Sequence, residues 1–263
     1  MRTRCNDIDV SWSEVGRGEP LVLIHGLADD HRAWRKVLPV LMLRNRLMLY
    51  DLRGHGETSL GSPDGTLKQL GDDLVRLLDA LQVDSANVAG FSLGGTIAMR
   101  VAIDHPERLR GLVLVATSSR VGRAVAEWYQ QRVDMVNGKD PQLRATLDRD
   151  TADVYAESPE ELEAGLFIRR QSTADPRGYG NACAAMAALH AAPLDPELGR
   201  ISAPTLIVAS DLDRHCPPKA AQIIAAGIEG SRLEVIAGAG HPIALERPTE
   251  LATLIYSHVV DRD

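Results

Sequence analysis

Ala86-Asn87-Val88-Ala89-Gly90-Phe91-Ser92-Leu93-Gly94-Gly95 is the stretch that decides the fold of this 263-residue chain. Its first half is apolar and predicts a buried strand, and residues 93–102 follow with a helical pattern. So tight a turn strains its central residue, and flanking glycines keep side chains out of it. Gly90-Phe91-Ser92-Leu93-Gly94 therefore predicts a strand–turn–helix unit that presents Ser92 as a nucleophile.

Short apolar runs and amphipathic helical stretches alternate along much of the chain. This alternation is typical of a mainly parallel sheet that is covered by helices on both faces. We expect about eight strands, of which the sequence marks 21–24, 47–50, 87–90, 112–115, 206–209, 233–236 and, as an antiparallel hairpin partner near the edge, 8–15. The clearest helices are expected at 67–81, 219–226 and 248–260.

Residues from about 117 to 199 break this alternation. No convincing strand falls there, whereas helical patterns cover 123–135, 160–170 and 179–189 and prolines punctuate them. We therefore predict a core domain from residues 1–117 and 200–263, with residues 118–199 inserted as a helical cap.

Composition limits the classes of function. The chain has 44% hydrophobic and 25% charged residues, which is ordinary for a soluble enzyme, and its net charge of −7 with no basic stripe argues against a nucleic-acid partner. The three cysteines have no metal-ligand spacing, so neither a metal site nor a disulfide is predicted. No apolar run is long enough for a membrane span and no secretory signal is visible, so we expect a cytoplasmic protein that does not bind membranes.

Three further motifs follow strands in chain order. His25-Gly26-Leu27 comes directly after the first core strand, and the amide of Leu27, together with that of Leu93, could bind a developing oxyanion. The alternative is that His25-Gly26 is only a turn. The His25 side chain itself is predicted to fix this loop rather than to catalyse.

The second motif, Ser210-Asp211-Leu212-Asp213, follows a late strand and offers a carboxylate that could orient an imidazole. Asp211 and Asp213 compete for this role, and Asp213 is favoured because an aspartate early in the loop commonly forms the turn. The third motif is Gly240-His241-Pro242, whose histidine on a glycine-flanked loop can reach the serine. His215 is its only serious rival.

The order Ser92, Asp213, His241 resembles the catalytic triad of the α/β-hydrolase superfamily, and the resemblance covers nearly the whole chain. Asp51-Leu52-Arg53-Gly54-His55-Gly56 is similar to the D-x-R-G-x-G turn of that family, in which Asp51 and Arg53 would fix neighbouring turns. The stretch from His241 to Pro248 resembles its usual ending. The resemblance implies an α/β-hydrolase fold and a serine nucleophile that needs no cofactor.

Within that superfamily the chain most resembles the 3-oxoadipate enol-lactonase subgroup. The similar stretches are 128–133, at the start of the cap, and 178–185 through 205, where the cap returns to the core. His25-Gly26 departs from the Asn-Ser dipeptide of some members. The subgroup implies a carboxylated enol lactone as substrate, for which Phe91, Trp128, Arg132 and Met186 are our candidate substrate-binding residues. Arg169 and Arg170 are further candidates for binding a carboxylate.

These observations predict a cofactor-independent serine hydrolase that cleaves a carboxylic ester or lactone through an acyl-enzyme. Its partner is expected to be a small-molecule substrate, and homo-oligomerisation is left open. A carbon–carbon bond hydrolase, a lyase or a perhydrolase on the same scaffold is the alternative enzyme class. A binding protein that kept the fold and lost turnover is a third hypothesis.

Overall fold

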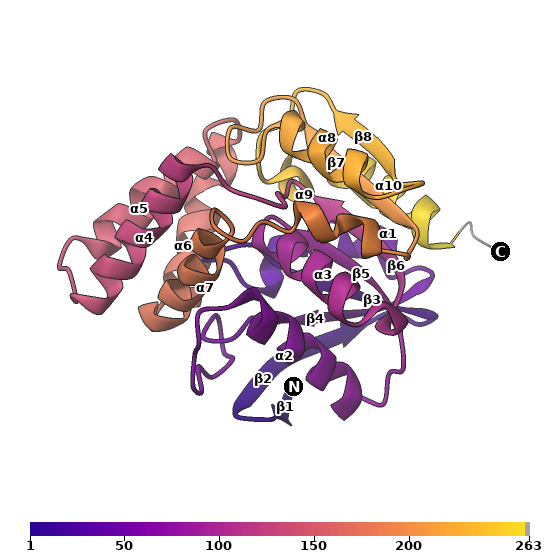
Figure 1. The fold of residues 1–263 in the computed structure, drawn as a ribbon, viewed down its shortest axis with the longest axis horizontal. Helices are drawn as coiled ribbons and strands as arrows, with labels where there is room; N and C mark the ends of the chain where they lie inside the picture. Colours follow the sequence, from indigo (N-terminus) through magenta and orange to yellow (C-terminus); the bar gives the residue numbers. More distant parts are fainter. Residues whose placement is uncertain (261–263) are drawn as a thin grey trace.

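The computed structural model describes residues 1–260, so the last three residues of the predicted core, 261–263, lie outside the described part. Its centre is one eight-stranded sheet (Figure 1). The strands are β1 (Arg2–Cys5), β2 (Ile8–Val15), β3 (Glu19–Ile24), β4 (Asn45–Tyr50), β5 (Ala86–Phe91), β6 (Leu109–Val115), β7 (Thr205–Ser210) and β8 (Arg232–Ile236). The sequence marked seven of these; β1, a short strand with mostly polar residues, was not marked.

The strand order in the sheet is β1-β2-β4-β3-β5-β6-β7-β8. β2 pairs antiparallel with β1 and β4, and all pairs from β4 to β8 are parallel. The predicted sheet of about eight mostly parallel strands, with helices on both faces, is confirmed. Because β3, β5, β6, β7 and β8 run in one direction, the loops after them meet at one edge of the sheet.

Helices cover both faces of the sheet, and alternate residues of each strand supply the two cores. Val22, Val88 and Leu112 face one side, and Leu23, Ala89 and Val113 face the other. The first side is covered by α2 (Leu67–Ala80), α3 (Leu93–Asp104) and α8 (Pro218–Gly227). The second is covered by α1 (Leu38–Leu41), α9 (Ile243–Glu246) and α10 (Pro248–Val260).

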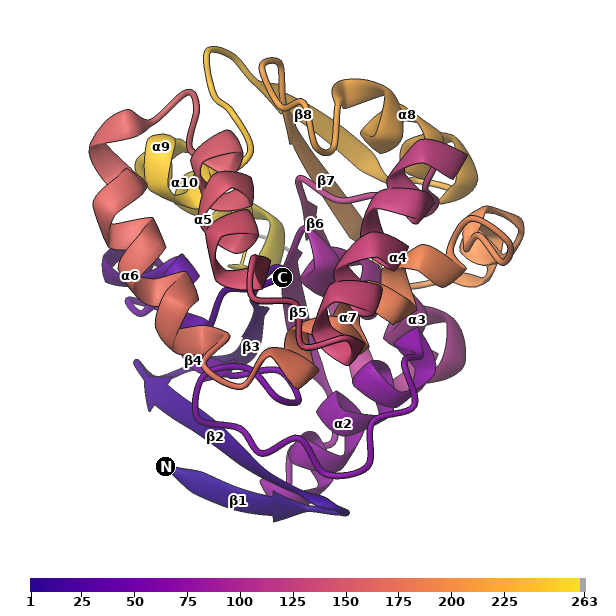
Figure 2. The ribbon, with the colours of Figure 1, turned by 90° about the vertical axis from the view of Figure 1, so that its left-hand side faces the viewer.

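Between β6 and β7 the chain leaves the sheet and forms helices beyond its carboxyl edge (Figures 1 and 2). These helices are α4 (Arg123–Asn137), α5 (Leu143–Val154), α6 (Leu162–Ser172) and α7 (Pro176–Ala188). We call them the cap helices. They occupy the predicted insertion, although α5 was not among the helices expected there. Short 3-10 turns elsewhere are η1 (His31–Trp34), η2 (Pro106–Arg108), η3 (Pro159–Glu161) and η4 (Asp195–Arg200). No helix within residues 1–260 has the length and apolar character needed to cross a membrane.

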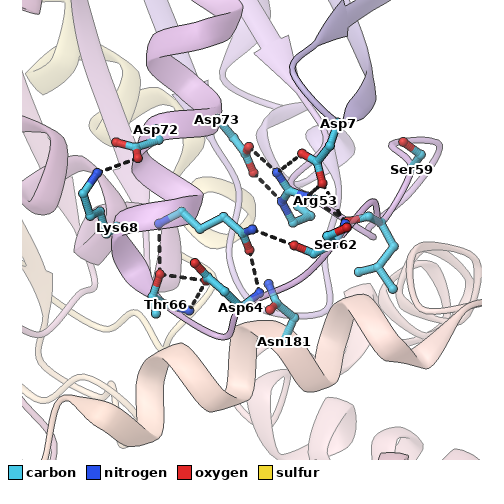
Figure 3. Close-up of polar contacts among 12 residues, drawn as sticks. Asp7, Arg53, Ser59, Ser62, Asp64, Thr66, Lys68, Asp72, Asp73 and Asn181 are labelled. Atoms are coloured by element: carbon cyan, nitrogen blue, oxygen red, sulfur yellow. Dashed lines mark hydrogen bonds and ion pairs between the residues drawn. The ribbon is translucent and has the colours of Figure 1, made fainter.

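A buried arginine ties the first hairpin to α2 (Figure 3). The side chain of Arg53 is only 1% exposed, and its guanidinium donates two hydrogen bonds to Asp73 on α2 and two to Asp7 between β1 and β2. It also donates to the carbonyl of Leu60 at 2.9 Å. The hydrogen bonds from Arg53 lower the pKa of Asp7 to about 2. Arg53 therefore fixes neighbouring turns, as the sequence predicted.

We expect Arg53→Met to lower the free energy of unfolding by about 3–5 kcal/mol, because it leaves the buried carboxylate of Asp73 without its partner. Urea unfolding followed by circular dichroism measures this. The control is Arg177→Met, which removes an exposed ion pair with Asp175 and should leave the free energy of unfolding nearly unchanged. Equal effects of the two substitutions would contradict the structural role of Arg53.

Candidate active site

The turn between β5 and α3 holds Ser92 in a strained backbone conformation. Its φ is 52° and its ψ is −119°, a region that residues other than glycine rarely adopt. A Cβ atom at Gly90 would collide with the carbonyl of Gly94, and one at Gly94 would collide with the carbonyl of Ile24 on β3. Glycine at both positions therefore lets α3 start directly against the sheet, and Ser92 stands at the tip of the turn.

Three side chains from distant parts of the sequence meet above the carboxyl edge of the sheet. The hydroxyl of Ser92 lies 3.1 Å from Nε2 of His241, and Nδ1 of His241 lies 2.8 Å from Oδ2 of Asp213. With Asp213 ionised, Nδ1–H donates to the carboxylate and Nε2 is left to accept from Ser92. The loops after β5, β7 and β8 bring these residues together.

The rival residues of the sequence analysis occupy other places. The carboxylate of Asp211 accepts the amide of Gly238 at 2.7 Å and so fixes the following loop. The ring of His215 lies beside that of His241, with 5.1 Å between the ring centroids. In the structure His241, rather than His215, is hydrogen-bonded to Ser92.

The Asp213 carboxylate is buried and fully hydrogen-bonded. Its Oδ1 accepts the backbone amides of His215 at 2.8 Å and Cys216 at 2.9 Å, while Oδ2 faces His241. Burial on its own would raise the pKa of Asp213, but the charge and hydrogen bond of His241 and the two amides outweigh burial and lower it. The carboxylate can therefore stay charged and hold the imidazole in one orientation.

The loop after β3 is fixed by a buried histidine. Nδ1–H of His25 donates to the carbonyl of Gly26 at 2.8 Å, and Nε2 accepts the amide of Leu52 at 2.9 Å. The Gly26 carbonyl also accepts the amide of Asp29 at 3.3 Å. Since N–H and C=O of a trans peptide point in opposite directions, this arrangement sets the direction of the Leu27 amide.

The backbone amides of Leu27 and Leu93 belong to the loop after β3 and to the start of α3. The first belongs to the fixed loop, and the second is the first amide of α3, where helix N–H groups lack partners within the helix. Within residues 1–260, no hydrogen bond is found from either amide to another protein group. Both remain our predicted oxyanion donors.

A cavity of about 370 Å³ opens above Ser92 and His241, between the cap helices and the sheet edge. One part of its wall is apolar or aromatic and includes Leu27, Phe91, Val125, Trp128, Tyr129, Leu147 and Val154. The Phe91 ring also packs against His241, with 4.9 Å between centroids. Phe91 and Trp128 thus lie where the sequence analysis placed them, at the cavity.

The rest of the wall is charged and comes mostly from α5 and α6. Three of its arginines have a carboxylate partner: Arg169 pairs with Asp29, Arg170 with Asp148, and Arg214 with Glu157. Arg144 differs, because its guanidinium donates only to the hydroxyl of Thr173 at 3.1 Å and to its carbonyl at 2.9 Å. Among residues 1–260, no ion pair involves Arg144.

Two candidate substrate-binding residues do not line this cavity. The guanidinium of Arg132 donates two hydrogen bonds to Asp150, and it stacks 4.3 Å from the ring of Trp128. Arg132 therefore supports the cavity wall from behind. Met186 is buried in the core between α7 and the sheet helices. The sequence places both residues on helices that the structure contains. It also places them on the cavity side of these helices, and there the prediction is wrong.

The sequence analysis missed the contribution of α5. This helix supplies Arg144, Leu147, Asp150 and Asp153 to the cavity. Its signal was the spacing of Leu143, Leu147 and Thr151, which are buried on one side of an otherwise polar helix.

One group of possible metal ligands lies apart from the triad. Ligand atoms of Asp30, His31 and Asp51 lie within 4.8 Å of one another. Both carboxylate oxygens of Asp30, however, accept from the guanidinium of Arg32, and Oδ1 of Asp51 accepts from the ring and the amide of His31. These oxygens already have partners within the protein, so the group fits a structural cluster.

The comparison with known families finds a match to the alpha/beta hydrolase fold over residues 19–248. Among curated proteins, 3-oxoadipate enol-lactonase 2 of Acinetobacter baylyi is 30% identical over 247 residues, which cover 92% of this chain and 90% of that protein. The pimeloyl-[acyl-carrier protein] methyl ester esterase of Aeromonas hydrophila is 29% identical over 94% of this chain and 98% of its own.

A solved structure, that of a hydrolase from Pseudomonas aeruginosa PA01, superposes with a TM-score of 0.89 at 27% identity. The match covers 99% of this chain and 98% of that one. The similarity therefore extends over both the sheet and the cap helices.

Proposed function

The chain belongs to the alpha/beta hydrolase family, and we propose that it is a serine hydrolase that cleaves carboxylic esters or lactones through an acyl-enzyme. The observation that carries this proposal is the continuous hydrogen-bonded line from Ser92 through His241 to Asp213, with its open end in the cavity. The enol-lactonase and the esterase that it resembles act on bonds of this class.

Acylation starts when Ser92 attacks the carbonyl carbon of the substrate. Nε2 of His241 takes the hydroxyl proton as the new C–O bond forms, and Asp213 stabilises the resulting imidazolium. His241 then gives this proton to the leaving oxygen as its bond to the carbonyl carbon breaks. In deacylation a water molecule attacks the acyl carbon and loses a proton to His241. His241 then gives this proton to the Ser92 oxygen as its bond to the acyl carbon breaks, which releases the acid and restores the serine hydroxyl.

The oxyanion of each tetrahedral intermediate is bound by the amides of Leu27 and Leu93 in this mechanism. Such a donor typically contributes about 3 kcal/mol to the stability of the transition state. His25 supports one of the two amides by fixing the Gly26 peptide. No step requires a group other than the protein and water.

We expect Ser92→Ala to lower kcat for p-nitrophenyl esters about ten-thousand-fold or more while leaving the unfolding curve unchanged, because no other group replaces the nucleophile. Ser118→Ala is the matched control, since its hydroxyl lies against the thiol of Cys216 instead of an imidazole and its loss should leave turnover intact. Retained turnover in Ser92→Ala would overturn the assignment.

Measuring kcat/KM of the wild-type protein for a panel of esters, lactones and vinylogous diketones tests which class of bond it cleaves. Esters or lactones should give the highest kcat/KM. Diketones as the best substrates would favour the carbon–carbon bond hydrolase instead, and a wild-type protein with no turnover and no reaction with a fluorophosphonate would favour the binding protein.

The cavity also favours a substrate that carries a negative group. Within the described residues Arg144 is the cavity arginine without an ion pair to a carboxylate, so an anionic group bound there would complete its contacts. The apolar wall of Trp128 and Tyr129 suits the hydrocarbon part of such a substrate. The carboxylated lactone implied by the enol-lactonase resemblance has this combination.

Arg144→Met should raise KM for a carboxylated ester about tenfold or more, because a charge-assisted hydrogen bond is lost. KM for a neutral ester of the same length should change by less than about twofold. Arg149→Met is the control, since Arg149 is an exposed residue of the same helix outside the cavity wall. Equal changes for the charged and the neutral ester would show that Arg144 does not bind an anionic group.

A further inference from the structure

Two other rings lie against the imidazole of His241. Phe91 packs on it with 4.9 Å between the centroids and 44° between the planes, and His215 does so at 5.1 Å and 47°. His241 is only 5% exposed, whereas His215, which lines the cavity, keeps part of its surface exposed. The His215 ring therefore covers a part of His241 that would otherwise face the cavity.

The carboxylate that orients His241 also places His215. Oδ2 of Asp213 faces Nδ1 of His241, and Oδ1 accepts the backbone amide of His215. The hydrogen bonds of its two ring nitrogens, to Asp213 and to Ser92, hold the His241 ring at these atoms. They leave the ring free to tilt about the line that joins the two nitrogens. Contacts with the neighbouring rings of Phe91 and His215 limit such a tilt. The backbone of Asp153, at the end of α5, raises the pKa of His215 and opposes the effect of burial.

We propose that His215 is a positioning residue, whose ring holds the His241 imidazole in line with the Ser92 hydroxyl. This inference rests on the proposed function of Ser92 and His241. It gives a role in turnover to a side chain that is not hydrogen-bonded to the serine.

An imidazole suits this place because it can stay neutral. Partial burial and the neighbouring His241 lower the pKa of His215, and Asp213 and Arg169 act on it in opposite directions. A neutral ring packs beside the imidazolium that forms during acylation without repelling it. A fixed cation at the same place would oppose the charge that His241 must gain.

The test compares His215→Ala and His215→Phe. Removing the ring should lower kcat for a short neutral ester about five- to tenfold, the value of a tilted aromatic pair, with a smaller change in KM. His215→Phe retains a ring and should keep kcat within about twofold of the wild type. Both variants keep the backbone amide that Asp213 accepts, and His190→Ala, at an exposed residue outside the cavity wall, is the control.

The rate at which a small fluorophosphonate labels Ser92 should fall in parallel in His215→Ala, because it depends on the same proton transfer to His241. Equal labelling rates and kcat in His215→Ala and the wild type would overturn the proposal. A His215→Phe variant with a kcat as low as that of His215→Ala would also overturn the proposal, because a ring at this position would then not be what maintains turnover.

Ring-current shifts separate this proposal from the proposed function. In proton NMR spectra the Hε1 resonance of His241 should move in His215→Ala and return toward its wild-type position in His215→Phe. This result would support the ring contact even in a protein that hydrolysed no ester. An unmoved resonance in His215→Ala would contradict the contact, whatever the activity of the wild type.

Discussion

The close approach of α3 to the sheet is the constraint on which the rest of the structure depends. Gly90 and Gly94 lack the Cβ atoms that would push the helix away, and the chain between them is forced through a positive φ at Ser92. This strain costs about 1–3 kcal/mol and persists because the buried strands on both sides fix the turn. This conformation places the Ser92 hydroxyl within hydrogen-bond distance of the His241 ring.

The cap helices turn this exposed serine into an enclosed site. They supply most of the cavity wall, and within residues 1–260 Arg144 is the arginine of that wall without an ion pair to a carboxylate. The core supplies the groups that would do chemistry and the cap supplies those that would select a substrate. This division explains how one sheet edge can serve relatives with different substrates.

The sequence predicts the core of the site better than its wall. Ser92 directly follows β5, and Asp213 and His241 lie on the loops after β7 and β8, so their positions depend on local patterns that meet at one sheet edge. Whether a cap residue reaches the cavity depends on which face of its helix it occupies. Arg132 and Met186 were assigned to the cavity, but Arg132 contacts Asp150 and Met186 packs in the core. Arg144 went unnoticed because α5 is mostly polar and only its buried side shows a helical spacing.

The most direct test of the account is to trap the acyl-enzyme. The wild-type protein, mixed with an excess of a slowly hydrolysed p-nitrophenyl ester and quenched in acid, is digested and its peptides are weighed by mass spectrometry. The account predicts that the peptide containing Ser92 gains the mass of the acyl group and that no other peptide does so in step with turnover. Rapid ester hydrolysis with the acyl group on another residue, or with Ser92 never modified, would contradict it.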